Sequence, residues 1–101
     1  MATIVFTYSP NEGVKLEEFK KFLDEVDGPV TLKIPSAKSI RKLLVVDEGA
    51  TFKVIELLEV TSIEEWKKDT AMPTPEVKKV LDLWPQFGKV SEMKIYNCVE
   101  Y

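Results

Sequence analysis

Strand-like and helix-like apolar patterns alternate along this chain in an order that leaves few topologies open. Residues 3–8 are β-branched and aromatic, and turn formers follow them, so we predict a first strand there. From Val14 to Val26 the apolar residues recur at spacings of three and four, which predicts an amphipathic helix. We expect Asp27-Gly28-Pro29 to end it, because Gly28 suits a left-handed cap and Pro29 cannot continue the helical ladder.

After a connector at residues 30–38, the patterns indicate a hairpin, an interrupted helix and a last strand. The predicted elements are strands at 39–46 and 51–60 around the loop 47–50, helical pieces at 61–73 and 74–88, and a strand at 90–101. The resulting order is β-α-β-β-α-β, the split arrangement of a ferredoxin-like fold. We therefore predict one α+β domain over residues 1–101, with a four-stranded antiparallel sheet and both helices on one face.

Size and charge exclude several other classes of protein. A chain of 101 residues has room for one core, and a central hairpin does not fit a doubly wound sheet. The net charge of −3 makes nucleic acid and anionic membranes poor partners. No apolar run approaches the roughly 20 residues that span a bilayer, and no signal peptide is evident, so we expect a cytoplasmic protein.

The content of histidine and cysteine restricts the available chemistry. The chain has no histidine, which removes every imidazole base and every histidine ligand for haem or metal. Cys98 is the single cysteine, so neither a disulfide framework nor a cysteine metal cluster is possible. The four glycines form no phosphate-binding fingerprint. We expect no metal and no cofactor.

The strand at 51–60 is apolar on both of its faces. Phe52, Val54, Leu58 and Val60 share one row with Glu56, while the other row places Ile55 and Leu57 between charged residues. Two helices cover one face of a sheet, so the other face would expose apolar surface on the order of 400–500 Å². We therefore expect a homodimer in which this free face of the sheet meets a second copy.

The residues that carry a family resemblance run along this strand and into the following helix. They are Phe52-Lys53-Val54-Ile55-Glu56-Leu57-Leu58-Glu59-Val60-Thr61-Ser62-Ile63-Glu64-Glu65-Trp66, then Pro75-Glu76-Val77 and Trp84. With them the whole chain resembles the dimeric α+β barrel superfamily, and within it the small RedY-like proteins associated with prodiginine-type pigment pathways. The resemblance implies two ferredoxin-like subunits with their sheets pressed together, and it spans members from monooxygenases to proteins without known activity.

Glu56 is the first candidate for a catalytic residue, because it interrupts an otherwise apolar row. In a cleft between the sheet and the helices or a partner, desolvation would raise its pKa and make it a base near neutrality. A simple loop at 47–50 would place Arg41 opposite Glu56 on the same face. The alternative interpretation is an internal ion pair that only satisfies two buried charges.

The candidate ligand-binding residues are Arg41, Tyr8 and Asn97. Tyr8 ends the first strand, where a tyrosine commonly anchors the edge of a core, and Asn97 interrupts the last strand. Trp66 and Trp84 lie at helical spacing from other apolar residues, and we interpret both as packing residues.

Three functions remain open at this point. The first is a homodimeric barrel protein of undetermined activity that binds an apolar or aromatic small molecule in the cleft between its sheet and the helices or the partner subunit. The second is a cofactor-independent enzyme of secondary metabolism, such as a monooxygenase or isomerase, that uses Glu56 as its base. The third is a structural or regulatory module whose interior is filled by its own side chains.

Overall fold

The computed structural model describes residues 1–101 and contains the predicted order of strands and helices. Its elements are β1 (Ala2–Pro10), α1 (Leu16–Phe22), the π-helical turn η1 (Leu23–Asp27), α2 (Gly28–Thr31), β2 (Ala37–Leu44), β3 (Val54–Val60), α3 (Ile63–Ala71), α4 (Pro75–Phe87) and β4 (Gly88–Asn97). None of these helices is long and apolar enough to cross a membrane.

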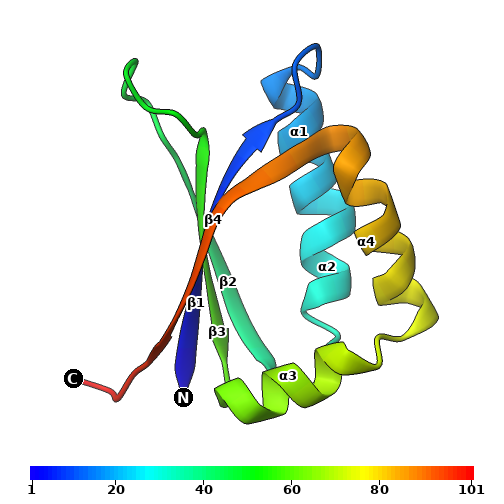
Figure 1. Ribbon diagram of the computed structural model, residues 1–101, viewed down its shortest axis with the longest axis vertical. Coiled ribbons are helices and arrows are strands. Elements are labelled where there is room, and N and C mark those ends of the chain that lie inside the picture. The colour runs from blue at the N-terminus through cyan, green and yellow to red at the C-terminus, as the bar shows by residue number, and fades with distance from the viewer.

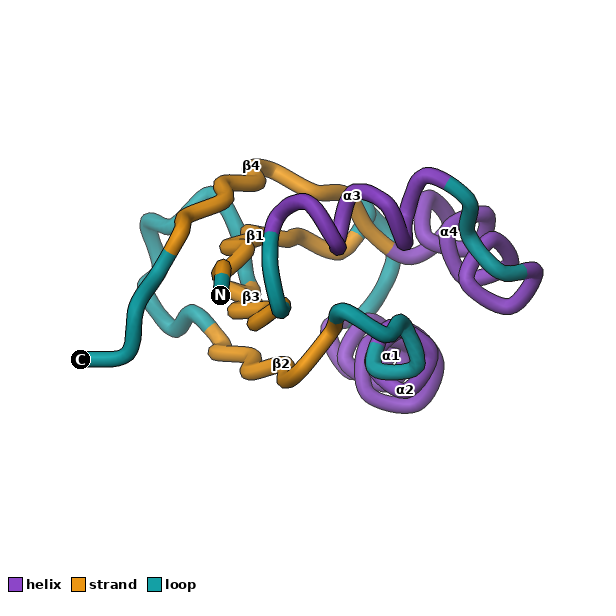
Figure 2. The backbone as a smooth tube through the Cα atoms, turned by 90° about the horizontal axis from the view of Figure 1, so that it is seen from below, coloured by secondary structure: helices purple, strands orange, loops and turns teal.

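The strands form one antiparallel sheet in the order β2-β3-β1-β4. Figure 1 shows this sheet edge-on, with α1, α2 and α4 on one side of it and α3 closing the lower end. In the view from below, α3 crosses from the sheet towards α4, and the opposite face of the sheet carries no helix (Figure 2). The ferredoxin-like α+β prediction is therefore confirmed.

The first helix does not end where the sequence predicts. Gly28 has helical angles, φ −58° and ψ −54°, and its N–H donates to the carbonyl of Leu23 five residues back. The chain therefore continues through a π-turn into α2 instead of turning at a left-handed cap. Pro29 follows the π-turn directly as the second residue of α2, where the regular helical ladder is already interrupted. The predicted stop at Asp27-Gly28-Pro29 is wrong.

The hairpin register also differs from the prediction. β2 pairs with β3 so that Lys42 lies opposite Glu56 and Arg41 lies opposite Leu57, after an irregularity near the start of β2. A shift of one residue exchanges the two faces of a strand, so Arg41 is on the face opposite to Glu56. The expected pairing of Arg41 with Glu56 is wrong because the connection after β2 is longer than the four residues assumed.

The buried core lies on the helical side of the sheet and is divided into two clusters. One cluster joins residues of β1, β3, the first helix and α4: Tyr8, Phe19, Phe22, Leu23, Val54 and Val80. The other lies at the far end of the same strands: Ala2, Ile4, Leu58 and Val60. Glu56 lies on β3 between Val54 of one cluster and Leu58 of the other, at the point where the core is interrupted.

The uncovered face of the sheet is mixed rather than mostly hydrocarbon. Its centre holds Val5, Ile55 and Leu57, which are half-buried by their neighbours on the sheet. Threonines of β1 and charged residues, among them Arg41 and Glu59, share this face by strand alternation. The apolar area available to a partner is therefore smaller than the sequence pattern suggests.

Candidate functional site

A cavity of about 760 Å³ lies between the helical face of the sheet and the helices of the same chain. Of the 22 residues that line it, 13 are hydrophobic, and the lining comes from β1, η1, α2, β3, α3, α4, β4 and the turns after α2 and α3. Ligand sites are commonly concave, mostly apolar and supplied with a few polar groups. The site is therefore enclosed by one subunit, and not by two facing sheets.

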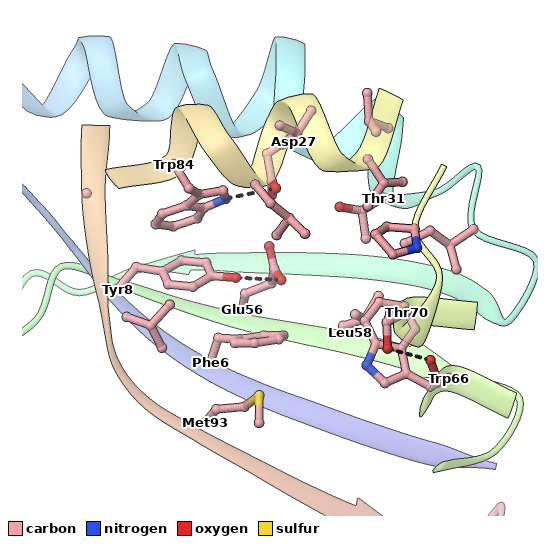
Figure 3. Close-up of a pocket in the computed structure, with 18 of the residues that line it drawn as sticks. Phe6, Tyr8, Asp27, Thr31, Glu56, Leu58, Trp66, Thr70, Trp84 and Met93 are labelled. Carbon is pink, nitrogen blue, oxygen red and sulfur yellow. Dashed lines mark hydrogen bonds between the residues drawn. The ribbon is translucent and has the colours of Figure 1, made fainter. Parts of the chain in front are cut away.

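Glu56 projects into this cavity from the middle of β3. Its side chain shares the helical face with Val54 and Leu58, and only 2% of the residue is exposed. The hydroxyl of Tyr8, on the neighbouring strand β1, donates a hydrogen bond of 3.0 Å to Glu56 Oε2 (Figure 3). The other carboxyl oxygen, Oε1, is buried without a partner. Glu56 thus offers a free hydrogen-bonding position to the cavity.

Asp27 supplies a second carboxyl group from the opposite wall. It is the last residue of the π-turn, and the indole N–H of Trp84 donates a 2.9 Å hydrogen bond to Asp27 Oδ1. Asp27 is buried, with 8% of its surface exposed. Figure 3 shows the carboxyl group of Glu56 directed from the sheet towards the helical side, where Asp27 and Trp84 lie.

Burial controls the acidity of these groups. Desolvation, followed by the nearby charge of Asp27, raises the pKa of Glu56 to about 7, although the Tyr8 hydrogen bond and Lys42 oppose the rise. Desolvation also raises the pKa of Asp27, against the hydrogen bond from Trp84 and the charge of Lys42. Burial raises the pKa of Tyr8 as well, so its hydroxyl stays protonated as a donor. A carboxyl group with a pKa near 7 can accept or release a proton at neutral pH.

Lys42 stands opposite Glu56 across the hairpin but does not bind it. Its ammonium group donates to Asp24 Oδ1 at 2.8 Å and to the carbonyl oxygen of Leu23 at 3.1 Å. Lys42 therefore ties β2 to the first helix, and acts on Glu56 only through its charge.

Aromatic side chains form much of the cavity wall around the two carboxyl groups. The rings of Tyr8 and Trp84 have centroids 4.7 Å apart, and Phe6 stacks on Tyr8 at 5.5 Å. Trp66 contributes from α3 at the other end of the cavity. These rings give an apolar ligand broad, rigid surfaces to contact.

The structure brings together some of the residues singled out from the sequence and separates others. Glu56 and Tyr8 lie in the cavity and are hydrogen-bonded to each other. Arg41 is exposed on the other face of the sheet, and Asn97 is exposed at the end of β4, opposite Ala2. Neither Arg41 nor Asn97 is among the residues that line the cavity.

Asp27 and the two tryptophans contribute more to the site than the sequence pattern indicates. Asp27 falls in the predicted helix stop, whereas in the structure it ends the π-turn and lines the cavity. Trp66 and Trp84 do pack against the core, but both also line the cavity. The local pattern Asp27-Gly28-Pro29 holds no signal for this outcome, because π-turns are rare and Gly-Pro is typical of a helix end.

No three histidine, cysteine, aspartate or glutamate side chains are gathered so that they could hold a metal ion. The two carboxyl groups and the aromatic wall suit an organic molecule better than a metal.

Solved structures similar to this chain share its fold over nearly its whole length. HapK from Hahella chejuensis superposes with a TM-score of 0.84 at 16% identity, covering 100% of this chain and 95% of that one. SnoaB from Streptomyces nogalater, a cofactor-independent oxygenase, gives 0.71 at 11% identity, with 99% and 94% covered. A dimeric ferredoxin-like protein of unknown function from Bacteroides fragilis gives 0.69 at 15% identity, with 96% and 95% covered.

Comparisons of sequence point to one family. A search of curated protein sequences finds no similar one. The family model described as REDY-like protein HapK matches residues 2–98, which is almost the entire chain. The chain therefore belongs to the REDY-like HapK family.

Proposed function

We propose that this protein binds an apolar or aromatic small molecule in the cavity between its sheet and its helices, with Glu56 and Tyr8 as polar contacts. The observation that carries the proposal is the buried, unpartnered Oε1 of Glu56 in the middle of a mostly apolar cavity. A cavity of about 760 Å³ also argues against the hypothesis of an interior filled by the chain's own side chains.

The energetics favour an occupant of the cavity. A buried acceptor without a partner costs about 1–3 kcal/mol, and a ligand that donates to Glu56 removes this cost. The apolar wall adds roughly 25 cal/mol for each Å² of ligand and protein surface that leaves water. Of the buried side-chain atoms without a partner, Glu56 Oε1 is the one that belongs to a residue of the cavity lining.

A fluorescence titration with the neutral probe N-phenyl-1-naphthylamine tests the proposal. We expect the probe to bind the wild type with saturable enhancement of its emission. Val77→Trp places a large side chain into the cavity from α4, and we expect it to weaken binding by at least about tenfold. Val77 is a half-buried residue on a helix, so the variant should fold.

The matched control is Lys78→Trp, which adds the same side chain to the neighbouring exposed position of α4, outside the cavity lining. Binding by this variant should equal that of the wild type. Equal binding by Val77→Trp and Lys78→Trp, or no saturable binding by the wild type, would contradict the proposal.

A second candidate function is cofactor-independent enzyme catalysis, with Glu56 as the proton acceptor. The observation that favours it is the placement of a carboxyl group with a pKa of about 7 beside the Tyr8 hydroxyl, in a mostly apolar cavity. SnoaB, which shares the fold, is a cofactor-independent oxygenase. Under this hypothesis Glu56→Gln abolishes turnover of a bound substrate while binding persists, whereas loss of folding would mark Glu56 as structural.

We also infer that two copies associate through the uncovered face of the sheet. Val5, Ile55 and Leu57 form an apolar centre there, surrounded by polar residues in the manner of an interface. The dimeric ferredoxin-like protein from Bacteroides fragilis supports this assignment by its shared fold. The cavity lies on the other side of the sheet, so dimerisation leaves it open to ligand.

A further inference from the structure

The donors that lie against the two carboxyl groups of the cavity are already engaged within the protein, which bears on the chemistry of its ligand. The Tyr8 hydroxyl donates to Glu56, the Trp84 indole donates to Asp27, and the Thr70 hydroxyl donates to the backbone of Trp66. The Thr31 hydroxyl and the Trp66 indole N–H are neutral donors in the lining without such a bond. A ligand therefore meets carboxyl oxygens whose protein donors leave capacity for more hydrogen bonds.

No lysine or arginine side chain forms an ion pair with either of these two carboxyl groups. Neither Glu56 nor Asp27 takes part in an ion pair. Lys42 is held by Asp24 and the backbone of Leu23. The other lysines of the cavity lining, Lys67 and Lys89, are exposed to solvent. Buried carboxyl groups are normally paired, so a pair without a cation is an unusual arrangement for a purely structural core.

The aromatic rings shape the apolar part of the site. The centroids of Tyr8 and Trp84 lie 4.7 Å apart, and Phe6 stacks on Tyr8 at 5.5 Å. Both polar contacts are made by ring edges, the Tyr8 hydroxyl to Glu56 and the Trp84 indole N–H to Asp27. The two carboxyl groups therefore lie beside a rigid aromatic surface against which the apolar skeleton of a ligand can pack.

Resting on the proposed function, we propose that this cavity selects small molecules whose apolar skeleton carries a positively charged or N–H-donating nitrogen. A protonated amine, an amidine or a protonated heteroaromatic ring has this chemistry. In the proposed complex the nitrogen donates to Glu56 Oε1 and to Asp27, while the skeleton packs against the rings and the apolar wall.

The acidity of the site fits this assignment. The groups that act on Glu56 are Tyr8 from β1, Asp27 from the π-turn and Lys42 from β2, and their combined effect leaves its pKa at about 7. A cation in the cavity favours the ionised form of both carboxyl groups and lowers both pKa values. Binding of such a ligand near pH 7 therefore releases protons from the protein.

The test compares three probes that share one apolar skeleton: 2-naphthylmethylamine, 2-naphthylmethanol and 2-naphthoate. At neutral pH these are a cation, a neutral alcohol and an anion. We expect calorimetric titration of the full chain to show the amine binding about tenfold or more tighter than the alcohol, with the naphthoate weakest. Titrations of the amine in buffers of different ionisation enthalpy should show proton release.

Two variants locate the preference on the carboxyl groups. Glu56→Gln and Asp27→Asn should each reduce the ratio of amine to alcohol affinity severalfold, whereas Glu64→Gln and Asp82→Asn, which remove the same charge from exposed positions outside the lining, should leave it unchanged. Should either cavity variant fail to fold, the probe series on the wild type still decides the matter.

The outcomes separate this inference from the function on which it rests. Binding of the alcohol or the naphthoate as tightly as the amine would overturn the inference and support the proposed cavity site. A preference for the amine that survives in both folded cavity variants would also overturn the inference. Failure of all three probes to bind would count against the proposed function itself.

Discussion

At the scale of single residues, Glu56 occupies a strand position that the alternation of β3 reserves for an apolar side chain. Its neighbours on the same face, Val54 and Leu58, are almost completely buried. β3 tolerates the carboxyl group because Tyr8 donates to it and because burial keeps it protonated over much of the acidic range. A buried carboxyl group at this position lowers the free energy of unfolding at neutral pH. Carboxyl groups with strongly raised pKa values cluster at binding and catalytic sites.

The raised pKa of Glu56 predicts how stability depends on pH. The folded-state pKa is about 7 against an ordinary value of 4.5, so between these values the folded chain holds a proton that the unfolded chain has lost. The free energy of unfolding therefore falls as the pH rises from about 4.5 to about 7, by about 3 kcal/mol at most from this residue. Urea denaturation at several pH values should show a clearly smaller fall in Glu56→Gln.

The exposed residue Glu64 provides the control for this experiment. Glu64→Gln should retain the pH dependence of the wild type, since its side chain lies in solvent on α3. The same slope in Glu56→Gln as in the wild type would show that folding does not raise the pKa of Glu56, contrary to our account.

At the scale of elements, the junction between α4 and β4 at Gly88 packs closely against the backbone of β1 and against Phe19 of the first helix. A Cβ at Gly88 would lie 2.7 Å from the carbonyl oxygen of Ser9 and 2.9 Å from Phe19 Cζ. The backbone oxygen cannot move without breaking the pairing of β1 with β4, which includes Pro10 opposite Gly88. The end of α4 and the beginning of β4 therefore require glycine for reasons of space.

We expect Gly88→Ala to lower the free energy of unfolding by about 1–3 kcal/mol. Gly49→Ala is the matched control, because a Cβ at Gly49 meets nothing within 4 Å. Chemical denaturation of the three proteins measures the effect. Equal midpoints for the two variants would mean that the contact between α4, β4 and Phe19 is looser than described.

The elements themselves were largely predictable, whereas their exact pairing was not. Periods of two and near four placed the strands and helices in the correct order, and α3 begins where the Ser62 hydroxyl accepts from the N–H of Glu65. The register of β2 on β3 depends on where the hairpin connection begins and ends, which composition leaves open. An error of one residue there moved Arg41 to the wrong face.

The site was predictable to the same limited extent. Glu56 could be found because it breaks an apolar row within one strand. Asp27 could not, because a helix with a π-turn and a helix that stops at Gly28-Pro29 share the same local pattern. The joining of Glu56, Tyr8 and Asp27 depends on contacts between distant segments, which a single sequence does not specify.

At the scale of the whole molecule, the uncovered sheet face predicts self-association. Sedimentation equilibrium should give twice the 11.5 kDa of the chain, with dissociation on dilution. Leu57→Lys places a charge at the apolar centre of this face and should favour the monomer, whereas Val46→Lys, in an exposed loop, should not. A wild-type mass of 11.5 kDa at every concentration would exclude the dimer.

The central claim is that the ligand site lies between the sheet and the helices of one chain, and the position of a bound ligand relative to the sheet tests it most directly. NMR of the methyl-labelled protein with N-phenyl-1-naphthylamine can record nuclear Overhauser effects between the probe and individual methyl groups. We predict contacts to Ile34, Leu58 and Val80, which line the cavity on the helical side. Contacts confined to Val5, Ile55 and Leu57, on the uncovered face, would contradict the account.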